Sequence, residues 1–269
     1  MQRIVVSALV PLVPDARELV ENDGLLLVDP HDLPALRERL RPGDGHVLIL
    51  GEKRHEALVR RHAAVLSDAG MPVAWRVAHH GPAALVLVAG QVAAAGVDAG
   101  IACVVADQLL EQTWSGAWTP SVARLEHPPV AVGQHLRSWL PGGDGFVVTF
   151  SGPAPAARAV GRAEPAEPVL ARGELYGAGL GRVPAAGLQD ALTTSGATGT
   201  ADVPALALDT AGRTGSDGAV ELVALPADRR LELPATRGRC DVCEALVFSD
   251  TCPFCHVRPS AADPRGVPA

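Results

Sequence analysis

Two pairs of cysteines near the C-terminus constrain the fold of this chain more than any other feature of its sequence. Cys240 and Cys243 form the first pair, Cys252 and Cys255 form the second, and eight residues separate the pairs. The two-residue spacing within a pair lets both thiolates bind one metal ion, and two such turns complete a tetrahedral site of four sulfurs. The sequence therefore predicts a metal-bound ribbon at residues 237–258 with these four cysteines as its ligands.

The second pair lies in a Cys-Pro-Phe-Cys sequence, which resembles the metal-binding knuckle of zinc ribbons and rubredoxins. The resemblance covers residues 238–257 and implies a short bacterial zinc ribbon. In those families a glycine commonly follows each pair and adopts a positive φ. Here Glu244 and His256 take these places. Histidine tolerates the left-handed region better than glutamate, so we expect the first knuckle to be strained or differently shaped.

The nature of the bound group follows from the composition of the ribbon. Zinc can supply about 10 to 16 kcal/mol to a module that has few apolar side chains to bury. A rubredoxin-like iron usually has a more aromatic shell than Phe248 and Phe254 provide, and disulfides require an oxidising compartment that nothing in the sequence indicates. We therefore expect structural zinc, with iron as the less favoured alternative. Four thiolates leave no open position for water, so a structural role is expected rather than a catalytic one.

Residues 1–151 alternate short aliphatic runs with amphipathic segments, which is typical of strands and helices in a layered α/β domain. With 48% hydrophobic and 20% charged residues, the chain can form a substantial core. Strands are predicted at residues 4–10, 25–28, 47–50, 73–77 and 146–150. Helices are predicted at residues 32–40, 52–67, 104–112 and 132–140. Residues 85–97 fit either a strand followed by a helix or one buried helix.

The remaining chain is less regular. Residues 152–170 are rich in proline and alanine and are interpreted as a linker or an irregular crossing. Residues 171–236 are predicted to be a small β-rich segment, with a meander over residues 205–209, 220–225 and 231–233. Residues 259–269 are predicted to be a disordered tail. The predicted fold class is α/β: a layered N-terminal α/β domain, then the small β-rich segment and the C-terminal zinc ribbon.

The net charge and the apolar runs indicate which partners and which cellular location to expect. The formal net charge of -7 opposes a general attraction to phosphate backbones, so nucleic acid is an unlikely partner. Pro11 interrupts the first apolar run, which favours a strand over a secretory signal. Polar residues and glycines interrupt the apolar stretch 83–106, which argues against a membrane span. These features predict a cytoplasmic protein.

Several other residues carry weak signals. Cys103 lies in an apolar run and is interpreted as a small buried hydrophobe. His55 and Glu56 begin like a metalloprotease signature, but Val59 replaces its second histidine, so His55 and His62 are expected to be solvated helix residues. The glycines within residues 177–181 lack a convincing strand-to-helix context. Gly51, His79 and His80 follow predicted strands, where open α/β sheets often bind ligands.

These observations identify no catalytic or cofactor-binding residues. The leading hypothesis is an intracellular accessory or assembly protein that binds a protein partner. Trp114, Trp118 and Trp139 are candidate interface anchors, although core packing is the default for tryptophan. One alternative is a small-molecule enzyme with its pocket at the sheet edge near Gly51 and His79. The other alternative is nucleic-acid binding through the ribbon.

Overall fold

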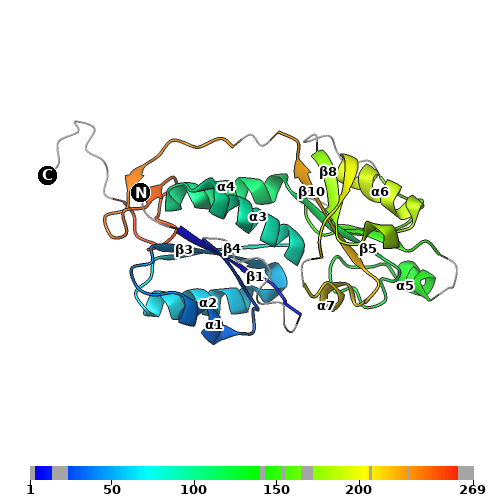
Figure 1. Cartoon of the computed structure of the whole chain (residues 1–269), viewed down its shortest axis with the longest axis horizontal. Helices are drawn as coiled ribbons and strands as arrows, with labels where there is room; N and C mark the ends of the chain where they lie inside the picture. The colour runs from blue at the N-terminus through cyan, green and yellow to red at the C-terminus, as the bar shows by residue number, and fades with distance from the viewer. Residues whose placement is uncertain are drawn as a thin grey trace.

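The structure is a computed structural model, and it describes residues 4–13, 24–139, 143–152, 155–164, 172–205, 208–228 and 231–259. Two layered units lie side by side along the long axis of the molecule, and the cysteine-rich segment lies at the far end of the first unit (Figure 1). The α/β fold class predicted from the sequence is confirmed. No helix in the described part of the chain is both long and apolar enough to cross a membrane.

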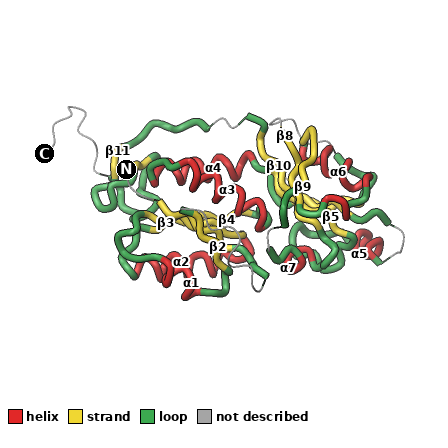
Figure 2. Tube along the Cα trace, viewed as in Figure 1, coloured by secondary structure: helices red, strands yellow, loops and turns green. Residues whose placement is uncertain are grey.

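The first unit is built on a parallel sheet with strand order β2-β1-β3-β4. Its strands are β1 (Ile4–Leu9), β2 (Leu25–Val28), β3 (His46–Glu52) and β4 (Val73–Ala78). Helices α1 (Leu33–Arg39) and α2 (Glu56–Asp68) cover one face, and α3 (Pro82–Ala95) and α4 (Ala99–Gln112) cover the other (Figure 2). Both faces are thus covered, which explains why β1 and β3 are continuous apolar runs rather than alternating ones.

Helix α3 resolves the ambiguity over residues 85–97, because residues 85–95 belong to one helix that ends before Gly96. Pro82 occupies its first turn, where a missing N–H has no consequence, and Gly96 ends it in the left-handed conformation at φ 57°. Its side chains are apolar nearly all round, including half-buried ones such as Leu87. A helix that is apolar on every side has no amphipathic period, so the sequence pattern could not distinguish it from a strand.

The second unit is a mixed sheet with strand order β7-β6-β5-β10-β8-β9. Its strands are β5 (Trp114–Thr119), β6 (Phe146–Thr149), β7 (Ala156–Ala159), β8 (Arg172–Gly177), β9 (Ala197–Asp202) and β10 (Val220–Pro226). Strands β8 and β9 pair in parallel and the other pairs are antiparallel. The accompanying helices are α5 (Val132–Ser138), the short 3-10 turn Leu180–Arg182, α6 (Ala185–Ser195) and α7 (Ala211–Thr214).

The strand pairing of the second sheet differs from the division expected from the sequence. The boundary placed at residue 151 falls between β6 and β7, and β7 lies within the predicted linker. Of the three strands of the predicted meander only β10 is present among the described residues, and it pairs with β5 and β8 instead. The paired residues are 45 to 110 positions apart in sequence, for example Leu222 with Gly177 and Ala224 with Trp114, so local periodicity carried no information about them. The predicted tail lies outside the described residues except for its first residue.

The two units share helix α3. Ala84 of α3 packs with Val223 and Leu225 of β10, and Leu87 lies against the same cluster. Only Thr113 separates the end of α4 from the start of β5. The N-terminal half of α3 therefore belongs to the core of both sheets.

Candidate functional site

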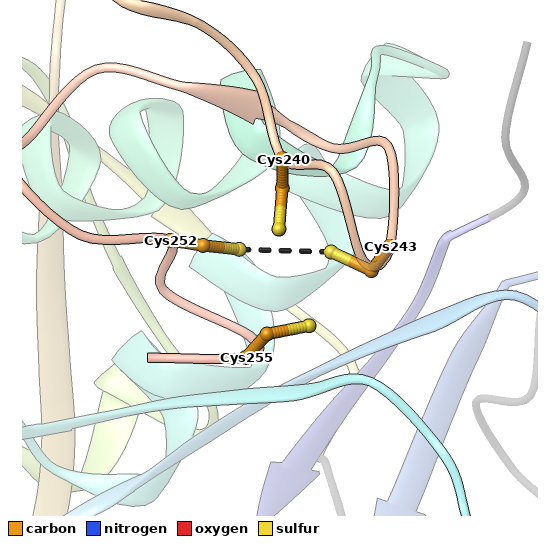
Figure 3. A group of neighbouring side chains, drawn as sticks. All are labelled: Cys240, Cys243, Cys252 and Cys255. Carbon is orange, nitrogen blue, oxygen red and sulfur yellow. Dashed lines mark hydrogen bonds between the residues drawn. The ribbon is translucent and has the colours of Figure 1, made fainter. Parts of the chain in front are cut away.

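The four cysteines of the C-terminal ribbon meet at one point. Their sulfur atoms all lie within 4.8 Å of one another, and the sulfurs of Cys243 and Cys252 are 3.6 Å apart. Figure 3 shows the four side chains pointing toward a shared centre. A tetrahedral ion with metal–sulfur distances of about 2.3 Å would separate its ligands by about 3.8 Å. The cluster therefore has the dimensions of a site for a single ion.

The two knuckles have the same backbone geometry. Glu244 and His256 adopt φ values of 60° and 57°, although neither is a glycine. The N–H of Glu244 donates to the carbonyl of Cys240 over 2.8 Å, and the N–H of His256 donates to the carbonyl of Cys252 over 2.9 Å. The first knuckle is therefore not differently shaped, and the positive φ at Glu244 is the strained feature that the sequence indicated.

The ribbon packs into the core of the first unit. Its short strands β11 (Gly238–Arg239) and β12 (Leu246–Val247) pair with each other next to α4. Asp98, which caps α4, accepts hydrogen bonds from the N–H groups of Gly100 and Leu246 at 3.0 and 3.1 Å. A Cβ on Gly100 would lie 1.8 Å from the carbonyl oxygen of Leu246, so only glycine permits this approach. The ring of Phe254 lies edge-on to His46 at 4.7 Å.

Two of the weaker sequence signals have structural roles. Cys103 is buried in α4, and burial raises the pKa of its thiol to about 12, so it is a packing residue as predicted. The prediction that His62 is solvated was wrong. It is buried beneath α2, with Nε2 at 3.0 Å from the carbonyl oxygen of Pro30, and burial lowers the pKa of its imidazole.

The residues expected at the sheet edge are placed there, but they do not converge. A Cβ on Gly51 would lie 2.4 Å from Val59, so this glycine serves the turn from β3 into α2. His80 is buried with Nε2 at 3.0 Å from the carbonyl oxygen of Thr113, and burial lowers the pKa of its imidazole to about 4. His79 stacks on His127 at 4.6 Å beside a small polar cavity of about 190 Å³.

An ion-pair network joins this edge to the second unit. The fully buried carboxylate of Glu52, at the end of β3, accepts hydrogen bonds from Arg213 of α7 and from Arg54. Arg213 also donates to the carbonyls of His79 and His80, at 2.6 and 3.0 Å. Because two guanidinium groups surround one buried carboxylate, the network fixes α7 against the ends of β3 and β4.

The tryptophans divide into two groups. Trp114 and Trp118 are buried in the core of the second sheet, and the indole N–H of Trp118 donates to the carbonyl of Asp144 at 2.9 Å. Trp139 is 75% exposed at the end of α5, next to the exposed side chains of Val132 and Leu136. Trp114 and Trp118 are therefore core residues, and of the three candidate interface anchors Trp139 is the one that lies on the surface.

A mostly apolar cavity of about 710 Å³ lies where the two units meet. Its wall comes from the start of α3, the strands β8 and β10, the segment that precedes α7, and Val13, four residues after the end of β1. The main apolar residues are Val13, Ala83, Leu87, Val223, Leu225 and Leu208, with Tyr176 beside them. This site had no recognisable signal in the sequence, because its residues come from separate segments and its apolar residues are ordinary ones.

The cavity wall includes one buried carboxyl group. Alternation along β10 places Glu221 on the same face as Val223 and Leu225, and only 8% of it is exposed. One oxygen, Oε1, accepts the N–H of Ala83 at the start of α3 over 3.0 Å. Burial raises the pKa of this carboxyl to about 8, although the nearby Arg213 opposes the shift. Glu221 is therefore largely protonated at neutral pH.

The glycines at 177–181 border the same cavity and form a strand-to-helix turn, which corrects the reading of the sequence. Strand β8 ends at Gly177, and Gly179 adopts φ 77° before the short turn and α6. The carboxylate of Asp202 accepts the N–H groups of Gly179 and Leu180 at 2.8 and 3.0 Å. Helix α6 was not predicted, because the glycines and the proline in residues 177–184 are typical of an irregular loop.

The sequence matches no protein-family model and no curated protein. Its fold is nevertheless similar to that of several solved structures. The DegV family protein Cg2579 from Corynebacterium glutamicum superposes with a TM-score of 0.51 at 15% identity, over 85% of this chain and 98% of that one. A DegV family protein from Eubacterium eligens, loaded with heptadecanoic acid, gives 0.51 at 12% identity over 83% and 99%. The fatty acid binding DegV family protein SAG1342 from Streptococcus agalactiae gives 0.52 at 9% identity over 85% and 100%. The chain therefore shares the two-unit fold of DegV family proteins.

Proposed function

We propose that this protein binds one long-chain fatty acid in the cavity between its two sheets. The observation that carries the proposal is the cavity itself, which has about 710 Å³ of space behind a mostly apolar wall. This volume lies within the range of roughly 300–1,000 Å³ that is common for small-molecule sites. Two proteins of similar fold are described as loaded with heptadecanoic acid or as fatty acid binding, which favours the same class of ligand here.

The proposal predicts a definite dependence on chain length. Burial of each methylene contributes about 0.8 kcal/mol, which corresponds to about a fourfold gain in affinity. Delipidated protein is titrated with saturated acids from octanoic to octadecanoic acid, with calorimetry as the readout. Affinity should rise about fourfold per methylene and then level off once the cavity is full. Equal affinity for short and long acids, or no binding of any of them, would contradict the proposal.

We also propose that Cys240, Cys243, Cys252 and Cys255 bind one structural zinc ion. The close convergence of the four sulfurs favours a site in which the protein fills every coordination position. Thiolates are soft ligands, which bind zinc more strongly than they bind hard cations such as magnesium or calcium. Cys252→Ser should reduce the metal content of the purified protein from about one equivalent of zinc to nearly none. Iron in place of zinc, or no metal in the unaltered protein, would contradict the assignment. A cytoplasmic location, where thiols stay reduced, is consistent with this site.

The other hypotheses from the sequence lead to separate tests. A protein partner remains a prediction, and the exposed residues Val132, Leu136 and Trp139 of α5 are where it is best tested. Trp139→Ser should then reduce partner capture without changing fatty-acid affinity. Nucleic-acid binding through the ribbon stays disfavoured by charge, since Arg237 pairs with Asp250 and Arg239 pairs with Asp98.

A further inference from the structure

We propose that the ion in the cysteine cluster strengthens fatty-acid binding, because the ribbon anchors a segment that ties one wall of the cavity to the first unit. We call this segment, residues 231–237, the strap. The inference rests on the proposed function and adds its regulation, since the metal content of the protein sets its affinity for the ligand.

The cavity is assembled from both units, so its shape depends on how the units are held together. Helix α3 lines it from the first unit through Ala83 and Leu87. Strand β10 lines it from the second unit through Val223 and Leu225, and the strap follows β10 in the chain. Among the described elements, the chain passes between the units twice: at Thr113, and between β10 and β11. Figure 1 shows the second crossing, which runs beside α4 to the ribbon.

The strap has little hold on the first unit by itself. All residues from 231 to 237 are exposed, and none of them belongs to a helix or strand. In the described structure its hydrogen bonds to α4 are the two made with Gln108, whose side chain accepts the N–H of Glu232 over 2.9 Å and donates to its carbonyl over 2.5 Å. Such exposed bonds compete with water and contribute little. The strap therefore depends on an anchor at its far end.

The ribbon provides that anchor. The N–H of Arg237, the last residue of the strap, donates to the carbonyl of Val247 over 2.7 Å, and its guanidinium lies 3.1 Å from the carboxylate of Asp250. The ribbon is fixed to α4 through Asp98, whose carboxylate accepts the N–H of Leu246 over 3.1 Å. The strap is thus attached to the first unit through the ribbon.

The ribbon in turn depends on its ion. Its strands β11 and β12 contain two residues each, and four thiolates this close together repel one another unless a cation lies between them. Metal binding supplies much of the folding free energy of such a small module. Removal of the ion should loosen the ribbon and release the strap, which leaves the two units freer to move apart. The ligand must then order both units as it binds, and this lowers its affinity.

The coupling is reciprocal, so it can be measured from either site. Heptadecanoic acid is titrated by calorimetry into zinc-loaded protein and into protein freed of metal by a chelator under reducing conditions. Circular dichroism checks that the metal-free protein is folded. The metal-free protein should bind the acid at least about fivefold more weakly. The affinity for zinc, measured by competition with a chelator, should rise by the same factor when heptadecanoic acid saturates the protein.

A lengthened strap separates this route from a general effect of the metal. An insertion of about twelve glycine and serine residues after Pro234 makes the strap flexible but keeps all four cysteines, so about one equivalent of zinc should remain bound. The affinity for heptadecanoic acid should nevertheless fall to that of the metal-free protein, and removal of zinc should have no further effect. The same insertion after Gly43, in an exposed loop of the first unit, is the control and should change neither property.

Equal affinities of the zinc-loaded and metal-free proteins, or an unchanged affinity in the variant with the lengthened strap, would overturn the inference and leave fatty-acid binding intact. Failure of the zinc-loaded protein to bind heptadecanoic acid would instead refute the proposed function. Absence of zinc from the unaltered protein would overturn the inference together with the metal assignment. If the metal-free protein does not fold, the zinc-loaded variant with the lengthened strap decides the matter.

Discussion

Removal of the Phe254 ring tests whether the ribbon is part of the core of the first unit. Phe254 is 4% exposed, contacts His46, and belongs to the same cluster as residues of β1, α3 and α4. Burial of an aromatic side chain removes about 150–250 Å² from water, which at about 25 cal/mol per Å² contributes about 4–6 kcal/mol. Phe254→Ala should therefore lower the free energy of unfolding by about 3–5 kcal/mol, allowing for partial relaxation of the cavity.

The assay is urea unfolding followed by far-UV circular dichroism, together with thermal melting. The expected loss corresponds to a fall in Tm of about 6–20 °C for a chain of this size. Val242→Ala is the matched control, because Val242 lies in the same ribbon but is 68% exposed, and it should change stability by less than about 0.5 kcal/mol. Zinc content should stay near one equivalent in both variants, since all four thiols remain. A loss below about 1 kcal/mol for Phe254→Ala would show that the ribbon is only an appendage.

Three further predictions concern the junction between the sheets. Leu87→Trp adds side-chain volume inside the cavity and should displace at least two ligand methylenes, so titration calorimetry should give about a tenfold or greater loss of affinity for heptadecanoic acid. Arg213→Met leaves the buried Glu52 with Arg54 and with His55, whose Nδ1 lies 3.8 Å from Oε1, and should lower the free energy of unfolding by about 2 kcal/mol or more. The exposed Arg182→Met should change it by less than about 0.5 kcal/mol, and similar values for both variants would contradict the network. Burial raises the pKa of Glu221 to about 8 in the folded protein, so the stability that this carboxyl contributes in its neutral form is lost as pH rises from about 5 through 8. The urea midpoint of the unaltered protein should fall over this range, and an equal fall in Glu221→Gln would exclude Glu221 as the cause.

The parallel sheet was predictable from sequence because its strands are continuous apolar runs. The predicted strand at residues 25–28 coincides with β2, and those at residues 4–10, 47–50 and 73–77 match β1, β3 and β4 to within two residues at each end. Covered parallel strands carry a strong local signal, since both faces are apolar.

The second sheet was not predictable in the same way. β5 contains two tryptophans, a serine and a glycine, and β7 is mostly alanine, so neither has the β-branched composition of a typical strand. Their pairing with β6 and β10 depends on contacts between distant segments. Tertiary packing therefore decided their structure over local propensity.

The cysteine cluster could be predicted from the sequence, whereas the cavity could not. The four cysteines lie within a short stretch, and two closely spaced cysteine pairs are a specific signature of a metal site. The cavity has no such signature, since it is formed by unremarkable side chains such as Leu87 and Val223 from both units. Glu221 alone could have been noticed, as a single charged residue in the otherwise apolar run 220–225.

Mass spectrometry of the intact, non-denatured protein tests the central claim most directly. Delipidated protein is mixed with a slight excess of heptadecanoic acid, and the mass of the complex gives the number of bound molecules. The account predicts one molecule per chain for the unaltered protein and clearly lower occupancy for Leu87→Trp under the same conditions. Absence of any complex, or equal loading of both proteins with several molecules per chain, would contradict binding in the cavity between the sheets.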